Sequence, residues 1–225
     1  MEKKLQKNSI KGVINKAIVP VKSSPGADSE TMDEIFYGTV VDVIEDTNSG
    51  WYLMQLYDDQ IGYIGKDSII TINERVEAWQ SQGNYVICRN FAHVCQRPNS
   101  ASRSIILLTE GCIVKQTGLE ETNNATNDIL QERWERVELV DGEYGWILCG
   151  FANRIYRLSI AEHEMQLRTN IVNTALHYRG TQFRHNGRSS FGIDSIGLAL
   201  AAYALNGYTI TRNMLRNMEY LKPIN

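Results

Sequence analysis

The sequence is poor in the features that mark several specialised classes of protein. No apolar run reaches the roughly 18 residues that a membrane-spanning helix requires. Neither sign of charge dominates, because 23 basic residues accompany 26 acidic ones, and this balance argues against a nucleic-acid-binding face. The basic first residues are not followed by an apolar stretch, so we expect no secretory signal. A cytoplasmic location is therefore predicted, with a periplasmic or cell-wall location as the alternative if a signal has been removed.

Cysteine is also scarce, and its spacing argues against a metal site. The four cysteines form no C-x-x-C pair, and no histidine lies at a zinc-ligand spacing from them. Each lies among apolar residues, which is typical of a buried free thiol in a reducing compartment. We therefore expect no metal and no cofactor, while a metal site or a catalytic thiol among Cys88, Cys95, Cys112 and Cys149 is the alternative.

The composition that is present is that of an ordinary globular protein. Apolar residues make up 43% of the chain and charged residues 22%, which excludes disorder as the dominant state. At roughly 100–200 residues per domain, the 225 residues allow one large domain or a few small ones.

The first two thirds of the sequence repeat. The interval 25–38, from a proline to a glycine, recurs at 98–111. The interval 51–62, from a tryptophan to a glycine, recurs at 134–145, and an aromatic residue follows the glycine in both copies. The second copy carries a polar insertion at 119–128, which predicts a solvent-exposed loop.

Both copies alternate with a period of two, which predicts short β-strands. The clearest predicted strands are 39–44, 51–56, 111–114 and 134–139. Turn residues at 48–50 and 141–142 separate them. Each copy holds enough short strands for a small barrel, which limits its exposed edges by curling.

The spacing within the copies resembles that of bacterial SH3-like domains. The second copy matches best, through Trp134, Val137, Leu139, Gly142, Gly145, Trp146 and Ile147. The resemblance implies a tail at 1–11, a first barrel at 12–75 and a second barrel at 84–150. We expect Trp51, Trp134 and Trp146 to pack in the barrels, with a groove for a peptide or glycan as the alternative.

Residues 151–225 change from strand to helix patterns. Ser159 and Glu162 have the spacing of a capping box, and apolar residues then recur at helical spacing up to Leu176. A polar, glycine-bearing loop at 180–192 follows, and a second helix is predicted at 196–205. The chain as a whole is therefore expected to be α+β.

The stretch 175–198 resembles the NlpC-type cysteine peptidases, which are murein peptidases with a papain-like fold. The residues that fit in register are Gly180, Phe183, Gly187, Arg188, Gly192, Asp194, Gly197 and Leu198, and Tyr203, Asn206, Gly207, Thr211 and Arg212 fit downstream. Two SH3-like domains before such a unit are similar to the dipeptidyl-peptidase VI branch, which cuts the γ-D-glutamyl–diamino-acid bond of peptidoglycan stem peptides. The resemblance implies that 151–225 is a partial papain-like domain.

The same resemblance assigns roles to four positions. Ser195 occupies the position of the nucleophilic cysteine at the start of a helix, where the unpaired N–H groups favour a thiolate. Asp194 keeps the position of the aspartate that binds the free amine of the substrate, and Arg188 and Gly187 are further substrate-binding positions.

The sequence departs from the family pattern in three ways. Ser195 carries a hydroxyl instead of a thiol, and Ile196 stands where a small serine is usual. The chain ends at Asn225, before the segment in which the family carries its catalytic histidine and the sheet half of the fold. An alcohol needs an adjacent strong base to act as a nucleophile, so we expect this chain to lack peptidase activity. A pairing of Ser195 with His185 is the minor alternative.

Three functional hypotheses follow. The chain is an inactive relative of a γ-D-glutamyl–diamino-acid endopeptidase that binds muropeptides at most. Alternatively, a second chain or a second copy covers the helical half-domain and completes a hydrolase. In the third hypothesis the two barrels form an interaction module for cell-wall polymer or protein.

Overall fold

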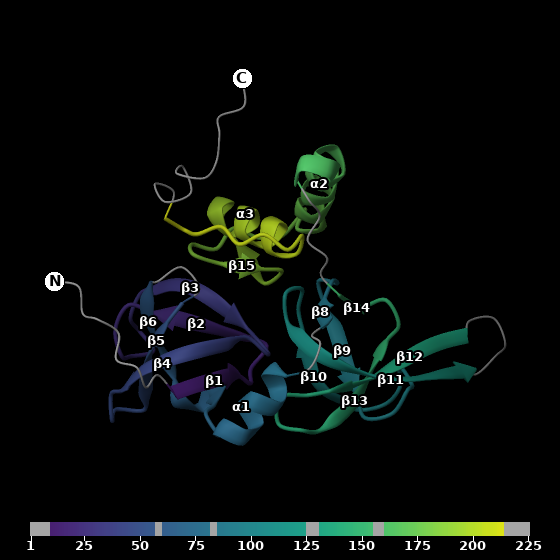
Figure 1. Ribbon diagram of the computed structural model, residues 1–225, viewed down its shortest axis with the longest axis horizontal. Helices are drawn as coiled ribbons and strands as arrows, with labels where there is room; N and C mark the ends of the chain where they lie inside the picture. The colour runs from purple at the N-terminus through teal and green to yellow at the C-terminus, as the bar shows by residue number, and fades with distance from the viewer. Residues whose placement is uncertain (1–9, 57–59, 82–84, 125–130, 155–159, 214–225) are drawn as a thin grey trace.

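The structure is a computed structural model that describes residues 10–56, 60–81, 85–124, 131–154 and 160–213. The described part is mostly β, with few helices, and two sheets lie side by side beneath a helical unit (Figure 1). Among the described residues, no helix combines the length and apolarity needed to cross a membrane.

The first sheet has seven strands, and all its pairings are antiparallel. It contains β1 (Ile10–Ile14), β2 (Ile18–Lys22), β3 (Thr31–Phe36), β4 (Val40–Asp46), β5 (Trp51–Gln55), β6 (Ile61–Gly65) and β7 (Ile69–Ile70). A 3₁₀ turn, η1 (Lys66–Ser68), connects the last two strands. The strand order is β3-β2-β6-β5-β4-β1-β7, and alternate side chains such as Val19 and Val21 of β2 point into its core. We refer to residues 10–70 as the first sheet unit.

The second sheet repeats this topology strand for strand. It contains β8 (Tyr85–Ile87), β9 (Ala92–Cys95), β10 (Ser104–Leu108), β11 (Ile113–Asn124), β12 (Gln131–Glu138), β13 (Tyr144–Leu148) and β14 (Ala152–Asn153). Its order, β10-β9-β13-β12-β11-β8-β14, matches that of the first sheet when each strand is shifted by seven. The internal repeat in the sequence is therefore a structural repeat, and we refer to residues 85–153 as the second sheet unit.

The repeated glycines Gly62 and Gly145 have the same steric role in both units. A Cβ at Gly62 would lie 2.3 Å from Cγ1 of Val21, and a Cβ at Gly145 would lie 2.3 Å from Cγ1 of Val94. Both valines are fully or almost fully buried. The glycine that recurs in the two copies is therefore explained by the same close contact in each unit, between β6 and β2 in the first and between β13 and β9 in the second.

The polar insertion at 119–128 is a strand where the structure describes it, so the loop prediction is wrong for 119–124. β11 continues to Asn124 and pairs with β12, with Glu120 opposite Glu135 and Thr122 opposite Arg133. Backbone pairing satisfies the strand's hydrogen bonds without a core, so polar side chains do not prevent a solvent-exposed hairpin. Residues 125–130 lie outside the described residues.

The tryptophan predictions are confirmed in part. Trp134 is buried at 2% exposure, whereas Trp51 and Trp146 are half-buried.

All four cysteines are free, with Cys95 and Cys112 buried and Cys88 and Cys149 half-buried. The structure therefore agrees with the prediction of free thiols, although only two are fully buried.

A short helix that the sequence analysis missed joins the two sheet units. Helix α1 (Asn73–Gln80) places Trp79 in the seam, where its Nε1 donates to the carbonyl oxygen of Gly38 at 2.9 Å. The seam also holds Tyr37, whose hydroxyl accepts a 2.9 Å hydrogen bond from the backbone N–H of Val140. One core cluster includes residues of both units, so the units pack as one body.

Replacing Tyr37 with phenylalanine tests this seam. The change leaves the Val140 N–H buried without an acceptor, so we expect a loss of about 1–3 kcal/mol in the free energy of unfolding. Urea unfolding followed by tryptophan fluorescence measures it. Tyr144→Phe is the matched control, because Tyr144 is 48% exposed, and it should change stability little. Equal stability of the two variants would contradict the seam contact.

The C-terminal unit lies over the seam of the two sheets (Figure 1). It consists of α2 (Ile160–His177), β15 (Arg188–Ser189), β16 (Gly192–Ile193) and α3 (Ser195–Ala204). Both predicted helices are present, and the predicted loop at 180–192 contains the small β15–β16 hairpin. The proposed cap residue Ser159 lies outside the described residues.

The C-terminal unit contacts both sheets. Asn186 Nδ2 donates to the carbonyl oxygen of Thr31 in the first sheet unit at 2.8 Å. On the other side, Phe91 of the second sheet unit meets Phe191 edge to face, with ring centroids 5.2 Å apart. The tertiary fold therefore sets the start of α3 against the first sheet unit.

Candidate functional site

The start of α3 is fixed by the aspartate that precedes it. Asp194 is the N-cap residue, and its Oδ1 accepts a hydrogen bond from the Gly197 N–H at 2.6 Å. Ser195 is the first helical residue and is exposed. The hydroxyl at the predicted nucleophile position therefore lies at a helix N-terminus, as the sequence predicts.

Glycines bring the chain close around this turn. A Cβ at Gly197 would lie 2.0 Å from the carbonyl oxygen of Gly187, and a Cβ at Gly187 would lie 2.4 Å from the carbonyl oxygen of Gly192. The Gly187 carbonyl also accepts from the Asp194 N–H at 3.1 Å. These three glycines of the sequence pattern are needed because larger side chains would not fit.

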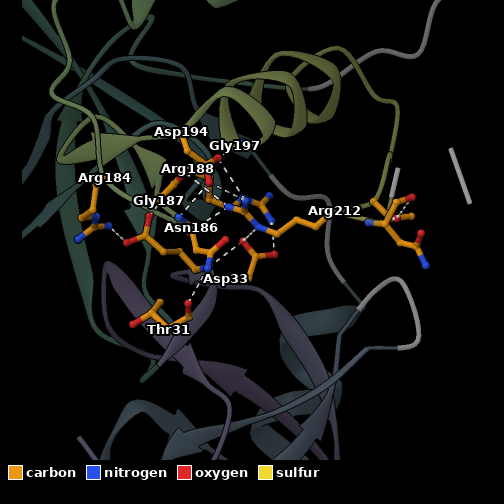
Figure 2. Close-up of polar contacts among 12 residues, drawn as sticks. Thr31, Asp33, Arg184, Asn186, Gly187, Arg188, Asp194, Gly197 and Arg212 are labelled. Atoms are coloured by element: carbon orange, nitrogen blue, oxygen red, sulfur yellow. Dashed lines mark hydrogen bonds and ion pairs between the residues drawn. The ribbon is translucent and has the colours of Figure 1, made fainter. Parts of the chain in front are cut away.

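A cluster of six ionic side chains lies beside the turn (Figure 2). We call it the ionic cluster, and its members are Asp33, Glu34, Arg184, Arg188, Asp194 and Arg212. The two acids Asp33 and Glu34 come from β3 of the first sheet unit and are 2% and 3% exposed. The three arginines and Asp194 come from the C-terminal unit, so the cluster joins two parts of the molecule.

Arg212 lies at the centre of the ionic cluster. Its Nε donates to Oδ1 of Asp33 at 3.0 Å, and its Nη1 lies 3.2 Å from both carboxylate oxygens of Asp194. Its Nη2 donates to the carbonyl oxygen of Asn186 at 2.9 Å. The side chain is 8% exposed, so one guanidinium links the first sheet unit to the start of α3 away from water.

The other two arginines hold the same pair of acids. Arg184 forms an ion pair with Glu34. Nη1 of Arg188 lies 3.6 Å from Asp33, its backbone N–H donates to Glu34 at 2.9 Å, and its guanidinium stacks over the ring of Phe36 at 5.2 Å. Three acids and three arginines thus balance in charge, which is the condition under which buried ionic groups are tolerated.

The environment lowers the pKa of Asp194. Burial alone raises it, but the hydrogen bond from the Gly197 N–H, the charge and hydrogen bonds of Arg212 and the hydrogen bond from the Asn186 N–H together outweigh that effect. The net pKa lies below the ordinary value of 3.8, so the carboxylate is charged at neutral pH.

All four sequence-predicted site residues come together in this region. Ser195 and Asp194 form the helix start, Gly187 lies in contact with them, and Arg188 projects to β3 (Figure 2). The sequence analysis matched Arg212 to the family pattern but gave it no role, and it missed Asp33 and Glu34 altogether. The sequence does contain one indication of these two residues. They are adjacent carboxylates directly before the apolar residues Ile35 and Phe36.

The histidines have other partners in the described part of the chain. Nδ1 of His177 lies 3.2 Å from Oε1 of the buried Glu110, and Nδ1 of His93 lies 3.0 Å from the Ser104 hydroxyl. His185 is exposed. No hydrogen bond between Ser195 and a histidine occurs among the described residues, and the same residues contain no cluster of metal ligands.

The comparisons with known proteins identify the family. A family model described as the bacterial SH3 domain matches residues 19–70, within the first sheet unit. Over 194 residues the chain is 32% identical to dipeptidyl-peptidase 6 of Lysinibacillus sphaericus, with 85% of this chain and 68% of that protein covered. This chain belongs to the dipeptidyl-peptidase 6 family.

Solved structures agree with the fold of this family. An NlpC/P60 family protein from Bacillus cereus superposes with a TM-score of 0.66, covering 90% of this chain and 74% of that one at 14% identity. An NlpC/P60 endopeptidase from Photobacterium damselae subsp. piscicida gives a TM-score of 0.54 at 13% identity, covering 93% of this chain and 45% of that one. This chain therefore has a fold similar to that of these two NlpC/P60 proteins.

Proposed function

We propose that this chain binds peptidoglycan stem peptides at the start of α3 and does not cleave them. Membership of the dipeptidyl-peptidase 6 family supports the substrate class. The observation that carries the loss of cleavage is the exposed Ser195 hydroxyl at the first position of α3. A helix N-terminus alone does not ionise an alcohol, and among the described residues no histidine hydrogen-bonds to it.

The free amine of a bound stem peptide would compete with Arg212 for the carboxylate of Asp194. A carboxylate offers about four lone-pair positions, and Asp194 already accepts hydrogen bonds from the Gly197 and Asn186 N–H groups and from Arg212. The ammonium group of a ligand can therefore pair with the Asp194 carboxylate only while Arg212 also pairs with it. We expect weak binding for this reason.

Isothermal titration with L-Ala-γ-D-Glu-diaminopimelate tests the proposal. We expect a dissociation constant of about 0.1–1 mM, and mass spectrometry of the incubated peptide should show it intact. Asp194→Asn keeps an N-cap side chain but removes the charge, and should weaken binding about tenfold. Asp28→Asn, at an exposed position of the first sheet unit, is the control and should bind normally. Absence of heat at millimolar peptide would reject binding, and a cleaved product would reject the loss of activity.

We also propose that the second sheet unit is an SH3-like barrel, with domain limits near 12–75, 84–150 and 151–225. The support is the strand order that the second unit shares with the first, to which the bacterial SH3 model matches.

A cytoplasmic location stays a prediction, which fractionation of cells expressing the natural gene would test.

A second candidate function is a hydrolase completed by another chain. The observation that favours it is a stripe of exposed apolar side chains along α2, formed by Met165, Val172 and Leu176 at 77%, 58% and 58% exposure. On α3, by contrast, Leu200, Ala201 and Ala202 are buried. Exposed apolar faces of this kind mark interfaces. A native mass spectrum with only the monomer at micromolar concentration would reject this candidate.

A further inference from the structure

Three hollows follow one another on the second sheet unit, away from the ionic cluster. The first, about 350 Å³, is lined by the loop before β10 and by Glu121 of β11. The middle one, about 270 Å³, shares Ser102 with the first. The last, about 400 Å³, shares Phe91 and Phe151 with the middle one. Because they share lining residues, the three hollows are neighbours on the surface, and we call them together the second-unit groove.

The middle hollow combines an apolar wall with hydroxyl groups. Leu148 and Phe151, which are half-buried, supply apolar surface, and the buried Trp134 lies beneath it. Hydroxyl groups of Ser100, Ser102 and Ser104 lie around it. Phe91 also lines this hollow and is 47% exposed, which is high for a ring of this size. An apolar side chain of a ligand would bury the exposed part of this ring while leaving polar groups for its backbone.

The last hollow carries one exposed cationic side chain. Arg89 lines it, and its guanidinium stacks over the ring of Phe151 with the carbon 5.8 Å from the ring centroid. No carboxylate among the described residues forms an ion pair with Arg89, and its hydrogen bond to the Cys88 carbonyl is long, at 3.4 Å. Asn90 and His177 also line this hollow, and Nδ1 of His177 lies 3.2 Å from the buried Glu110, so Arg89 is the exposed charged side chain of its lining. A guanidinium that lies over an aromatic ring keeps N–H donors for a carboxylate.

We propose that the second-unit groove binds the C-terminal end of a short peptide. The terminal carboxylate pairs with Arg89 in the last hollow, and an apolar side chain near the terminus packs on Phe91 and Phe151 in the middle hollow. The first hollow, which contains Arg97 and Glu121, accepts the preceding backbone through groups of both charges. A neutral glycan would use the aromatic wall but would leave the cationic end unmatched, so the charge distribution favours the peptide.

This groove is independent of the function proposed for the start of α3. Its lining residues do not include Asp194, Ser195 or any member of the ionic cluster. Peptide binding in the groove can therefore fail while stem-peptide binding at α3 succeeds, and the reverse also holds.

The test uses the full chain, labelled with ¹⁵N, and titration with acetyl-Ala-Ala-Leu-Leu as a free acid. We expect chemical-shift changes at Arg89, Phe91 and Phe151, with no shift at the start of α3. The C-terminal amide of the same peptide should bind about tenfold more weakly, because it loses a charge-assisted hydrogen bond. A tetramer of β-1,4-linked N-acetylglucosamine, as a glycan probe, should cause no shifts in the groove.

Two variants with matched controls locate the contacts. Arg89→Ala should weaken binding of the free acid about tenfold and leave binding of the amide unchanged. Arg103→Ala, at an exposed arginine of the same unit that lines none of the hollows, should bind normally. Phe91→Ala should weaken both peptides, whereas Tyr144→Ala should weaken neither.

Three outcomes would overturn the proposal. Equal affinity for the acid and the amide would remove the role of Arg89. Binding of the glycan alone would assign the groove to another ligand class. Absence of shifts at 5 mM peptide in a folded, ¹⁵N-dispersed protein would show that the groove binds no peptide end of this kind, with about 5 mM as the limit of a useful affinity.

Discussion

Replacing Arg212 with alanine is expected to lower the free energy of unfolding by about 3–5 kcal/mol, because it leaves two buried carboxylates without their shared cation. Asp33 and Asp194 are 2% and 8% exposed, so water replaces the guanidinium poorly. Urea unfolding measured by tryptophan fluorescence gives the value. The change should also weaken the attachment of the C-terminal unit, which hydrogen exchange in α3 would detect.

Arg168→Ala is the matched control for this prediction. Arg168 pairs with Glu164 one helical turn away on α2, and both side chains are about half exposed, at 51% and 56%. Exposed pairs of this kind contribute about 0.3–0.5 kcal/mol, so stability should hardly change. A similar small loss in both variants would mean that the ionic cluster contributes no more than a surface pair.

From the ionic cluster we also predict how the free energy of unfolding changes at acid pH. The pKa of Asp194 is lowered in the folded state, so its contribution is complete above the unfolded-state pKa and is lost as the pH falls through the folded-state value. We expect stability to hold from pH 7 to about pH 5 and to fall below about pH 4, where unfolded aspartates become protonated. The Gly197 N–H remains in Arg212→Ala, but the charge and hydrogen bonds of Arg212, which also lower the pKa of Asp194, are lost, so this fall in stability should move to higher pH. If stability falls over the same pH range in Arg212→Ala as in the unchanged protein, Arg212 does not lower the pKa of Asp194.

Replacing Ser195 with cysteine is expected to create the most reactive thiol in the protein. The introduced thiol would lie exposed at the first position of α3, where the helix dipole favours the thiolate. Burial raises the pKa of all four native cysteines, that of Cys112 to about 12. Alkylation by iodoacetamide at pH 7, mapped by mass spectrometry, should be at least about tenfold faster at position 195 than at any native cysteine.

A control at the opposite end of a helix isolates the effect of position. Ser81 is exposed at the C-cap of α1, where the dipole has the opposite sign. Ser81→Cys should therefore react at the rate of an ordinary exposed thiol. If both introduced thiols react equally fast, the start of α3 does not activate a thiol and the comparison with a cysteine peptidase loses its physical basis.

The local features of the site could be predicted from the sequence. The helix after Asp194 is visible because helical spacing depends on a few neighbouring residues, and the resemblance to the NlpC-type pattern marks the glycines at 187, 192 and 197. The strand repeat is visible for the same reason, since an alternation of period two is local. Helix α1 was missed because it is short and contains no side-chain cap: Ile72 precedes it without one.

The partners of Asp194 could not be predicted in this way. Arg212 and Asp33 are 179 positions apart in the chain, and no periodicity or spacing connects them. Their contact exists because the C-terminal unit packs on β3. The same packing forms the last hollow of the second-unit groove, where Arg89 and His177 meet from different units.

The sequence by itself determined the repeat, the position of the helix start and the family to which the chain belongs. Each of these depends on residues close together in the chain, where backbone geometry restricts which side chains are possible. The tertiary structure alone decided that Asp33 and Glu34 face the helix start, that three arginines neutralise them, and that α2 rather than α3 exposes its apolar side. These depend on surfaces that meet only after folding, because burial and ion pairing are set by what packs against a residue rather than by its neighbours in sequence.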